Sequence, residues 1–125
     1  MHALKLFTGI SILIFASTVI AAGKVTDERI LAESALGENW FLKGGNFRGE
    51  HYSPLSQINE GNVAELGLAW ASDLPLLDGI ATTPIVIDGV IYISGAYSIV
   101  LAIDASNGKI IWTYDPKVSD AFAEK

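Results

Sequence analysis

The side chains that could do chemistry in this sequence are mostly aspartates and asparagines at the ends of apolar runs. Asp88, Asp104, Asn107 and Asp115 all occupy such positions, two of them directly before glycine. Aspartate and asparagine side chains at these places bond to their own backbone and favour turns. Their spacing fits no EF-hand or comparable calcium loop. We therefore interpret them as turn residues, and the sequence predicts no metal ligand.

A second candidate segment, residues 44–51, combines glycine with charged side chains in the stretch GGNFRGEH. Its glycines follow no predicted strand and open no predicted helix, so they do not form a phosphate-binding loop. His51 has no convergent nucleophile or base, which favours loop packing or solvent exposure over catalysis. Arg48 and Glu50 are interpreted as a surface ion pair, worth ~0–1 kcal/mol. No catalytic residue is predicted within the chain.

Composition narrows the function classes further. The 125 residues carry a formal net charge of −6, and 50% of them are hydrophobic. This apolar content can support a packed core and argues against disorder. The negative charge argues against nucleic-acid binding, which needs clustered Lys and Arg. Because these residues include no cysteine, disulfides, thiolate metal sites and cysteine nucleophiles are excluded within them.

The first 22 residues differ in character from the rest. Lys5 precedes the apolar run LFTGISILIFASTVIAA, which ends in small residues. This order is typical of a secretory signal peptide, with cleavage expected between Ala21 and Lys24 and an extracytoplasmic destination. The run has 17 residues, at the short edge of the ~17–25 that a membrane-spanning helix needs. A retained membrane anchor is therefore the alternative.

Residues 23–38 are predicted to form a short helix, in the stretch TDERILAESALG. Thr26 can cap this helix, and Gly37 can end it. Asp27 and Glu28 suit the positive end of its dipole.

The stretch that follows, ENWFLKGGNFRGEHYSPLSQIN, is rich in Gly, Asn, Ser and Pro. It also carries four large aromatic side chains, so we expect an ordered loop that packs against another element: Trp40, Phe41, Phe47 and Tyr52. NEGNVAEL is predicted to form one helical turn, and GLAWASDL, residues 67–74, to form a strand.

Four short antiparallel strands are predicted at about residues 83–87, 90–94, 98–103 and 109–114. The first two meet at Asp88-Gly89, a dipeptide that favours a type I′ hairpin turn, and the last two turn at Asn107-Gly108. The runs PIVI, VIYI and IVLAI are apolar at nearly every position, whereas a sheet with one wet face would alternate. We therefore expect neighbours on both faces of this sheet.

Two stretches of sequence around a tryptophan resemble each other, as in an internal repeat. Trp70 and Trp112 lie 42 residues apart, and each is followed three residues later by aspartate. This spacing falls within the ~40–45-residue period of a four-stranded propeller blade. Together with the four strands predicted between the two tryptophans, this repeated pattern indicates a blade.

The hairpin around Asn107 carries a more specific pattern. Residues 102–112 resemble the tryptophan-docking motif of the eight-bladed quinoprotein propellers, Ala-x-Asp-x-x-Thr-Gly-x-x-x-Trp. Asn107 stands where threonine is usual, and four residues match the motif: Ala102, Asp104, Gly108 and Trp112.

The resemblance extends over most of the chain, from about Asn39 to Val118. The stretch NWFLKGGNFRGEHYSPLSQINEGNVAELGLAW resembles the amino-terminal signature of the pyrroloquinoline-quinone-dependent alcohol dehydrogenases. TPIVIDGVIYIS and WTYDPKV resemble the first blade of those enzymes.

The resemblance implies an all-β fold, a portion of an eight-bladed propeller in residues 39–125. It comprises one complete four-stranded blade at about residues 80–116 and an outer strand, LGLAW, that the family donates to its last blade. Trp112 is expected to stack on the next blade, with Gly108 allowing a tight turn and Ala102 giving room. Since such repeats need about three neighbours for stability, the chain is expected to be the front portion of a longer polypeptide.

The same resemblance implies an activity. The family oxidises an alcohol or related hydroxyl substrate with pyrroloquinoline quinone held beside Ca²⁺, and commonly passes the electrons to a c-type cytochrome. The base and the calcium ligands are expected beyond Lys125, so this chain alone is expected to be inactive. The family's cofactor-binding glutamate, three residues before Pro84, corresponds to Ala81, whose methyl group cannot replace a carboxylate's hydrogen bonds. Either a neighbour in sequence compensates (Asp78, Thr82 or Thr83), or the quinone is bound differently, or it is not bound.

The sequence thus predicts the front portion of a periplasmic quinone-dependent alcohol dehydrogenase, with cofactor-binding residues unknown. The partners expected are the remaining blades, an alcohol and a c-type cytochrome, and no nucleic acid. The alternative is a non-catalytic propeller scaffold of the cell envelope, which Ala81 favours.

Overall fold

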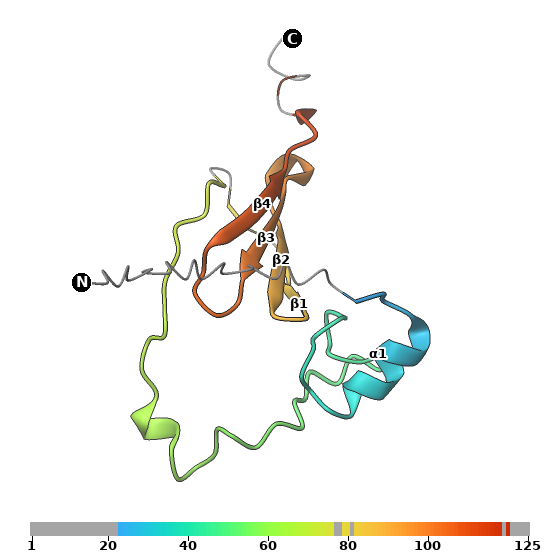
Figure 1. The fold of residues 1–125 in the computed structure, drawn as a ribbon, viewed down its shortest axis with the longest axis vertical. Helices are drawn as coiled ribbons and strands as arrows, with labels where there is room; N and C mark the ends of the chain where they lie inside the picture. Colours follow the sequence, from blue (N-terminus) through green and yellow to red (C-terminus); the bar gives the residue numbers. More distant parts are fainter. Residues whose placement is uncertain (1–22, 77–78, 81, 119, 121–125) are drawn as a thin grey trace, which may run out of the picture.

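The computed structural model describes residues 23–76, 79–80, 82–118 and 120 (Figure 1). The predicted signal peptide, residues 1–22, lies outside these described residues. The elements in chain order are α1 (Asp27–Ser34), η1 (Val63–Glu65), β1 (Ile85–Ile87), β2 (Val90–Ser94), η2 (Ala96–Ser98), β3 (Val100–Asp104) and β4 (Ile110–Tyr114).

The four strands form one antiparallel sheet in the order β1-β2-β3-β4, as the sequence predicts (Figure 1). The β1–β2 turn has positive φ at both central residues, 50° at Asp88 and 76° at Gly89. This is the backbone of a type I′ turn, so that prediction is confirmed. β3 begins two residues later than predicted because Ala96–Ser98 forms η2 instead of extended backbone.

The helix α1 is capped as the sequence predicts. The Thr26 Oγ1 atom accepts a hydrogen bond from the Arg29 N–H at 3.2 Å. Beyond the last helical residue, Gly37 takes a φ of 76° and donates its N–H to the Glu33 carbonyl at 2.9 Å. Within α1, Ile30 is the buried residue, and it packs in a cluster with Phe41 and Ile87.

The loop after α1 packs against the sheet at its first two aromatic residues only. Trp40 forms an antiparallel bridge with Val86 of β1, with N–H···O distances of 2.8 and 3.0 Å. Phe41 is 7% exposed, so packing is confirmed for these two. Phe47 and Tyr52 remain 59% and 71% exposed, so the packing prediction is wrong for them.

Burial on both faces of the sheet is confirmed for its third strand. Leu101, Ala102 and Ile103 of β3 are all buried, and successive residues of a strand point to opposite faces. All five residues of β4 are exposed, however. The sheet is therefore covered at its centre and open at its β4 edge.

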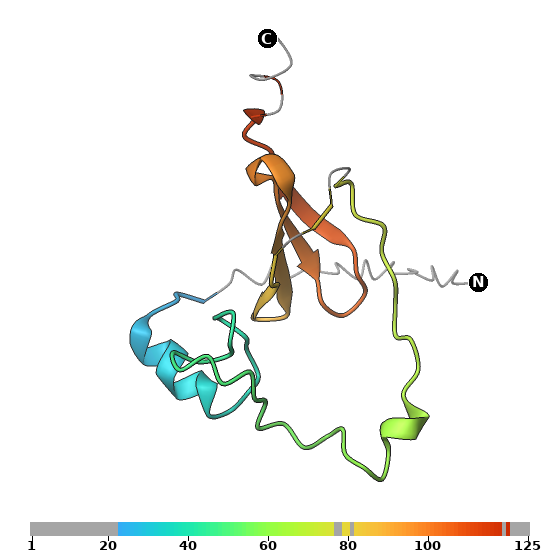
Figure 2. The ribbon, with the colours of Figure 1, turned by 180° about the vertical axis from the view of Figure 1, so that it is seen from behind.

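Residues 67–74 do not form the strand that the sequence predicts. They follow η1, which confirms the predicted helical turn, and no sheet pairing includes them. A strand needs a hydrogen-bonded neighbour, and the described part of the chain supplies none here. Figure 2 shows the segment as an extended trace returning toward the sheet, and Leu68 within it is 85% exposed.

Candidate functional site

Trp70 lies against the β3–β4 hairpin and not in a sheet. Its indole Nε1–H donates to the Ala105 carbonyl at 2.9 Å. A Cβ atom at Gly108 would lie 2.9 Å from Cζ3 of the Trp70 ring and closer still to Cε3. Since Gly108 also has a φ of 74°, the hairpin accepts the indole only because this residue is glycine.

Asp104 shapes the hairpin that receives the indole. Its carboxylate accepts hydrogen bonds from the Ser106 hydroxyl at 2.6 Å, the Ser106 N–H at 2.8 Å and the Asn107 side-chain amide at 2.8 Å. The Ser106 hydroxyl, followed by the Ser106 N–H, lowers the pKa of Asp104. A carboxylate so held is a poor proton acceptor, and the interpretation of Asp104 and Asn107 as turn residues is confirmed.

Ala102 separates two aromatic rings on one face of the sheet. It pairs with Tyr92 of β2 on one side and with Trp112 of β4 on the other. The two rings meet over it, with centroids 6.0 Å apart and planes tilted by 51°. Because Ala102 has only a methyl group, rings two strands apart can make this contact.

The four motif residues therefore lie in one hairpin. The sequence predicts only some of the contacts that they make. Trp112 remains 45% exposed, and its stacking on a following blade stays a prediction. The indole that contacts Gly108 is that of Trp70. This contact is not among those predicted from the sequence. The 42-residue spacing between the two tryptophans is the pattern from which it could have been predicted.

A second cluster joins α1 to the β1–β2 turn. The Asp88 carboxylate binds the Arg29 guanidinium through Nη1, at 3.2 Å, and through Nη2. Arg29 also donates Nε–H to Glu33 at 2.6 Å, and its Cζ lies 5.2 Å from the centroid of the Phe41 ring. The Asn39 side chain accepts the N–H of Asp88 at 2.7 Å.

This cluster changes the ionisation of both partners. The Arg29 guanidinium, followed by the Gly23 N–H, lowers the pKa of Asp88 below its ordinary value. Hydrogen bonds from Arg29 to Asp88 and then to Glu33 raise the pKa of Arg29. Asp88 occupies the turn that the sequence predicts, but the expectation that its side chain bonds to its own backbone is wrong. Its carboxylate binds Gly23 and Arg29 instead, 65 and 59 positions earlier, and sequence reasoning missed both contacts.

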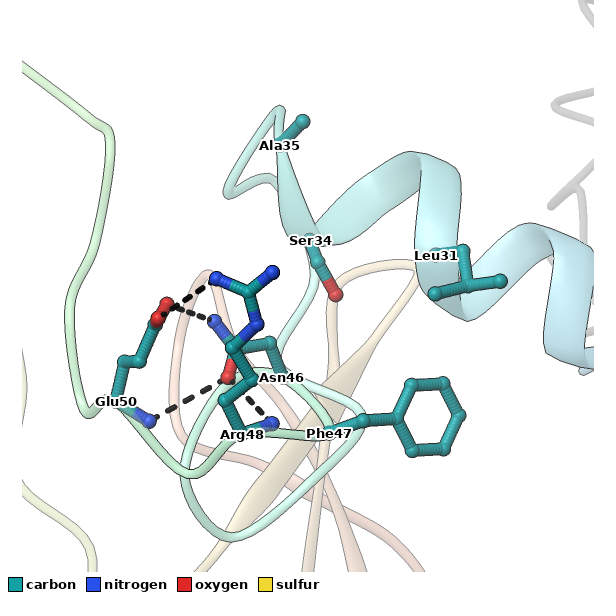
Figure 3. A pocket seen from close by; sticks show the side chains of 7 residues that line it. All are labelled: Leu31, Ser34, Ala35, Asn46, Phe47, Arg48 and Glu50. Carbon is teal, nitrogen blue, oxygen red and sulfur yellow. Dashed lines mark hydrogen bonds and ion pairs between the residues drawn. The ribbon is translucent and has the colours of Figure 1, made fainter.

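A pocket of about 270 Å³ lies between α1 and the 46–50 loop (Figure 3). Seven residues line it: Leu31, Ser34, Ala35, Asn46, Phe47, Arg48 and Glu50. The Glu50 carboxylate accepts from the Asn46 amide at 2.7 Å and from Arg48 Nη1 at 3.4 Å, which confirms the predicted surface pair. His51, next to the pocket, is exposed and donates its backbone N–H to the Gly44 carbonyl at 2.9 Å.

The described side chains do not fit a quinone–calcium site. Among them, no three His, Asp or Glu side chains come together as a group that could hold a metal ion. Asp104 and Glu50 accept hydrogen bonds within their own loops, Asp88 accepts them from Arg29 and Gly23, and Asp115 accepts the N–H of Lys117 at 2.8 Å. Ala81, at the family's glutamate position, lies outside the described residues.

A family model described as "Glucose/ethanol/alcohol dehydrogenase, beta-propeller domain" matches residues 40–125. The quinohemoprotein alcohol dehydrogenase ADH-IIG of Pseudomonas putida is 45% identical over 93 residues, which cover 74% of this chain and 13% of that protein. The 1-butanol dehydrogenase (cytochrome c) of Thauera butanivorans is 43% identical over 110 residues, which cover 88% of this chain and 14% of that protein.

Solved structures agree with these sequence matches. The quinohemoprotein alcohol dehydrogenase of Comamonas testosteroni is 42% identical, with a TM-score of 0.70 over 75% of this chain and 14% of its own chain. The chain thus spans about a seventh of the length of the relatives it matches.

Proposed function

Because the chain belongs to the glucose/ethanol/alcohol dehydrogenase β-propeller family, we propose that it is the amino-terminal part of a pyrroloquinoline-quinone-dependent dehydrogenase that oxidises an alcohol or related hydroxyl substrate. One observation carries this proposal: about three quarters of the chain aligns in structure with quinohemoprotein alcohol dehydrogenases, at 45% and 42% sequence identity. Likeness of sequence and of structure over the same residues distinguishes this family from other propellers.

The contribution of this part of the enzyme is structural. Pyrroloquinoline quinone, when bound, supplies the hydride-accepting chemistry, and a protein supplies its position and electrostatics. The described residues build a blade, β1–β4, and hold the Trp70 indole against its β3–β4 hairpin. The base and the calcium ligands belong, in this proposal, to residues beyond Lys125.

We place the enzyme in the periplasm, where a c-type cytochrome accepts its electrons. The order of charge, apolar run and small residues in positions 1–22 supports export. The relatives' names, quinohemoprotein and cytochrome-c-linked dehydrogenases, support the choice of acceptor. Within the described part of the chain, no helix combines the length and apolar character needed to cross a bilayer.

Activity of the complete polypeptide, which in this proposal continues beyond Lys125 and is called the full chain below, tests the proposal. Purified full chain is mixed with pyrroloquinoline quinone, Ca²⁺ and a series of primary alcohols, and reduction of a redox dye is followed. We expect alcohol-dependent reduction that is lost when the quinone is omitted. Residues 1–125 alone should show none. A full chain that binds no quinone and reduces no dye would instead support the propeller scaffold.

Ala81→Glu separates the enzyme from the scaffold more sharply. Restoring the carboxylate should tighten quinone binding by about 10- to 100-fold, since a hydrogen bond to a charged group is worth about 1.5–3 kcal/mol. Ala71→Glu, which adds the same charge to the exposed segment 67–74, is the control. Tighter binding in both variants would attribute the effect to net charge and not to position 81.

A further inference from the structure

Gly23 lies against the cluster that joins α1 to the β1–β2 turn. Its backbone N–H donates to the Asp88 Oδ2 atom at 2.7 Å, across a separation of 65 residues. The same oxygen accepts from Arg29 Nη1 at 3.2 Å, while Nη2 of Arg29 bonds to the other oxygen. The segment that begins at Gly23 is thus tied directly to the sheet.

The paired groups of this cluster carry two negative charges and only one positive charge. The single guanidinium of Arg29 faces two carboxylates, Asp88 from the turn and Glu33 from its own helix. The two other contacts bring no charge: Asn39 is a neutral amide, and Phe41 lies beneath the guanidinium. The Asp88 side chain is only 22% exposed and that of Glu33 only 16%. A second cation would therefore be attracted with less screening than at an open surface.

A side chain at position 23 would crowd the Arg29 guanidinium. A Cβ atom there would lie 2.8 Å from Arg29 Nη1 and 3.4 Å from Asp88 Oδ2. Moving the guanidinium aside would disturb its bonds to Asp88 and Glu33. Glycine therefore places its nitrogen beside Asp88 without displacing Arg29.

We propose that the chain is cleaved between Ala22 and Gly23 and that the new α-ammonium group of Gly23 then binds the Asp88 carboxylate as the second cation of this cluster. The inference rests on the export step of the proposed function. In the cleavage a hydrolase of the export machinery adds one water to the peptide bond. The water oxygen bonds to the Ala22 carbonyl carbon as the C–N bond breaks, which leaves a carboxylate on Ala22, and the two water protons end on the Gly23 nitrogen as an ammonium group.

The other two bonds in the expected window lack this consequence. Cleavage after Ala21 would leave the Gly23 nitrogen as an uncharged amide and place the ammonium group one residue away. Cleavage after Gly23 would remove the donor altogether. Only the middle bond puts a full positive charge on the nitrogen that lies 2.7 Å from Asp88.

The first readout is the amino-terminal residue of the full chain after export from a bacterial host, identified by mass spectrometry of the terminal peptide. We expect Gly23. A chain starting at Ala22 or Lys24 overturns this inference but leaves export intact. A chain that keeps Met1 overturns both this inference and the export step. Neither outcome depends on enzymatic activity, so failure of the dehydrogenase assay is separable.

The second readout is the pKa of the Gly23 α-amino group, measured by competitive labelling with an amine reagent across pH. We expect it at least about half a unit above the ordinary 7.7–8.0 in the native protein, and back at the ordinary value in denaturant. Asp88→Asn should abolish the rise, whereas Asp73→Asn, in the exposed segment 67–74, should keep it. An ordinary pKa in the native protein would overturn the binding of the α-ammonium group by Asp88.

Discussion

At the scale of single residues, the contact between Trp70 and Gly108 can be tested by comparing two glycines. Gly108 and Gly89 have nearly the same backbone conformation, with φ of 74° and 76°. A Cβ atom at Gly89 meets nothing within 4 Å, whereas one at Gly108 collides with the Trp70 ring. The pair therefore separates the effect of backbone conformation from that of the ring contact.

We expect Gly89→Ala to lower the free energy of unfolding by about 1–2 kcal/mol, the cost of a left-handed backbone for a residue with a side chain. Gly108→Ala should cost about 1–3 kcal/mol more, because the Trp70 ring must also move. Chemical denaturation of the full chain measures both values. Equal losses in the two variants would show that Trp70 does not rest on Gly108 in solution.

Local rules predicted the residues whose partners are close in sequence. The Asp88-Gly89 dipeptide fixes its own turn, and Asp104 finds its donors within three positions. The same rules could not assign Trp70 to Ala105, 35 residues away. That contact depends on how the chain returns to the sheet, and no single residue encodes such a path.

At the scale of elements, the Arg29–Asp88 pair ties α1 to the sheet, and its effect should depend on pH. Arg29 lowers the pKa of Asp88 in the folded protein below the ordinary value of 3.8. A carboxyl group whose folded-state pKa is depressed stabilises the fold above its unfolded pKa, and that stabilisation is lost as pH falls through the folded value. The contribution is therefore complete at pH 7 and fades below about pH 4.

Arg29→Gln should lower the melting temperature of the full chain at pH 7, and its deficit relative to the unsubstituted protein should shrink below about pH 4. Arg48→Gln is the matched control. Arg48 pairs with Glu50 at 3.4 Å while 84% exposed, and such pairs contribute little. The test is to measure the melting temperatures of both variants and of the unsubstituted protein from pH 7 to pH 3. An equal and pH-independent deficit in both variants would contradict a role for the Arg29–Asp88 pair.

The elements themselves were predictable where their partners are neighbours in the chain. The sheet follows from consecutive hairpins, and α1 carries its cap at Thr26 and its stop at Gly37. Residues 67–74 also carry several apolar side chains, yet they form no strand among the described residues. A strand exists only with a partner, and hydrophobicity alone does not supply one.

At the scale of the whole molecule, the exposed apolar side chains mark the surfaces that further blades of the proposed enzyme would cover. Trp112 and Ile111 on β4 are 45% and 55% exposed, and Leu68 in the 67–74 segment is 85% exposed. Because β3 is covered on both faces while β4 is open, the sheet resembles the terminal repeat of a stack with its next neighbour removed. Repeats of this kind draw much of their stability from such neighbours.

Residues 23–125 produced alone should therefore bind a hydrophobic dye such as ANS and melt over a broad range, whereas the full chain should bind little dye and melt cooperatively. The physical reason is that the full chain would cover β4 and the 67–74 segment. Fluorescence titration and calorimetry on both proteins measure the difference. A sharp, two-state transition of monomeric residues 23–125 without dye binding would mean that this blade needs no neighbour, and the burial of β4 in a ring would lose its energetic basis.

Trp112 gives a separate test of the same burial. Trp112→Ala in the full chain should lower the free energy of unfolding by about 3–5 kcal/mol if the next blade buries the indole, and by much less if the indole stays half exposed.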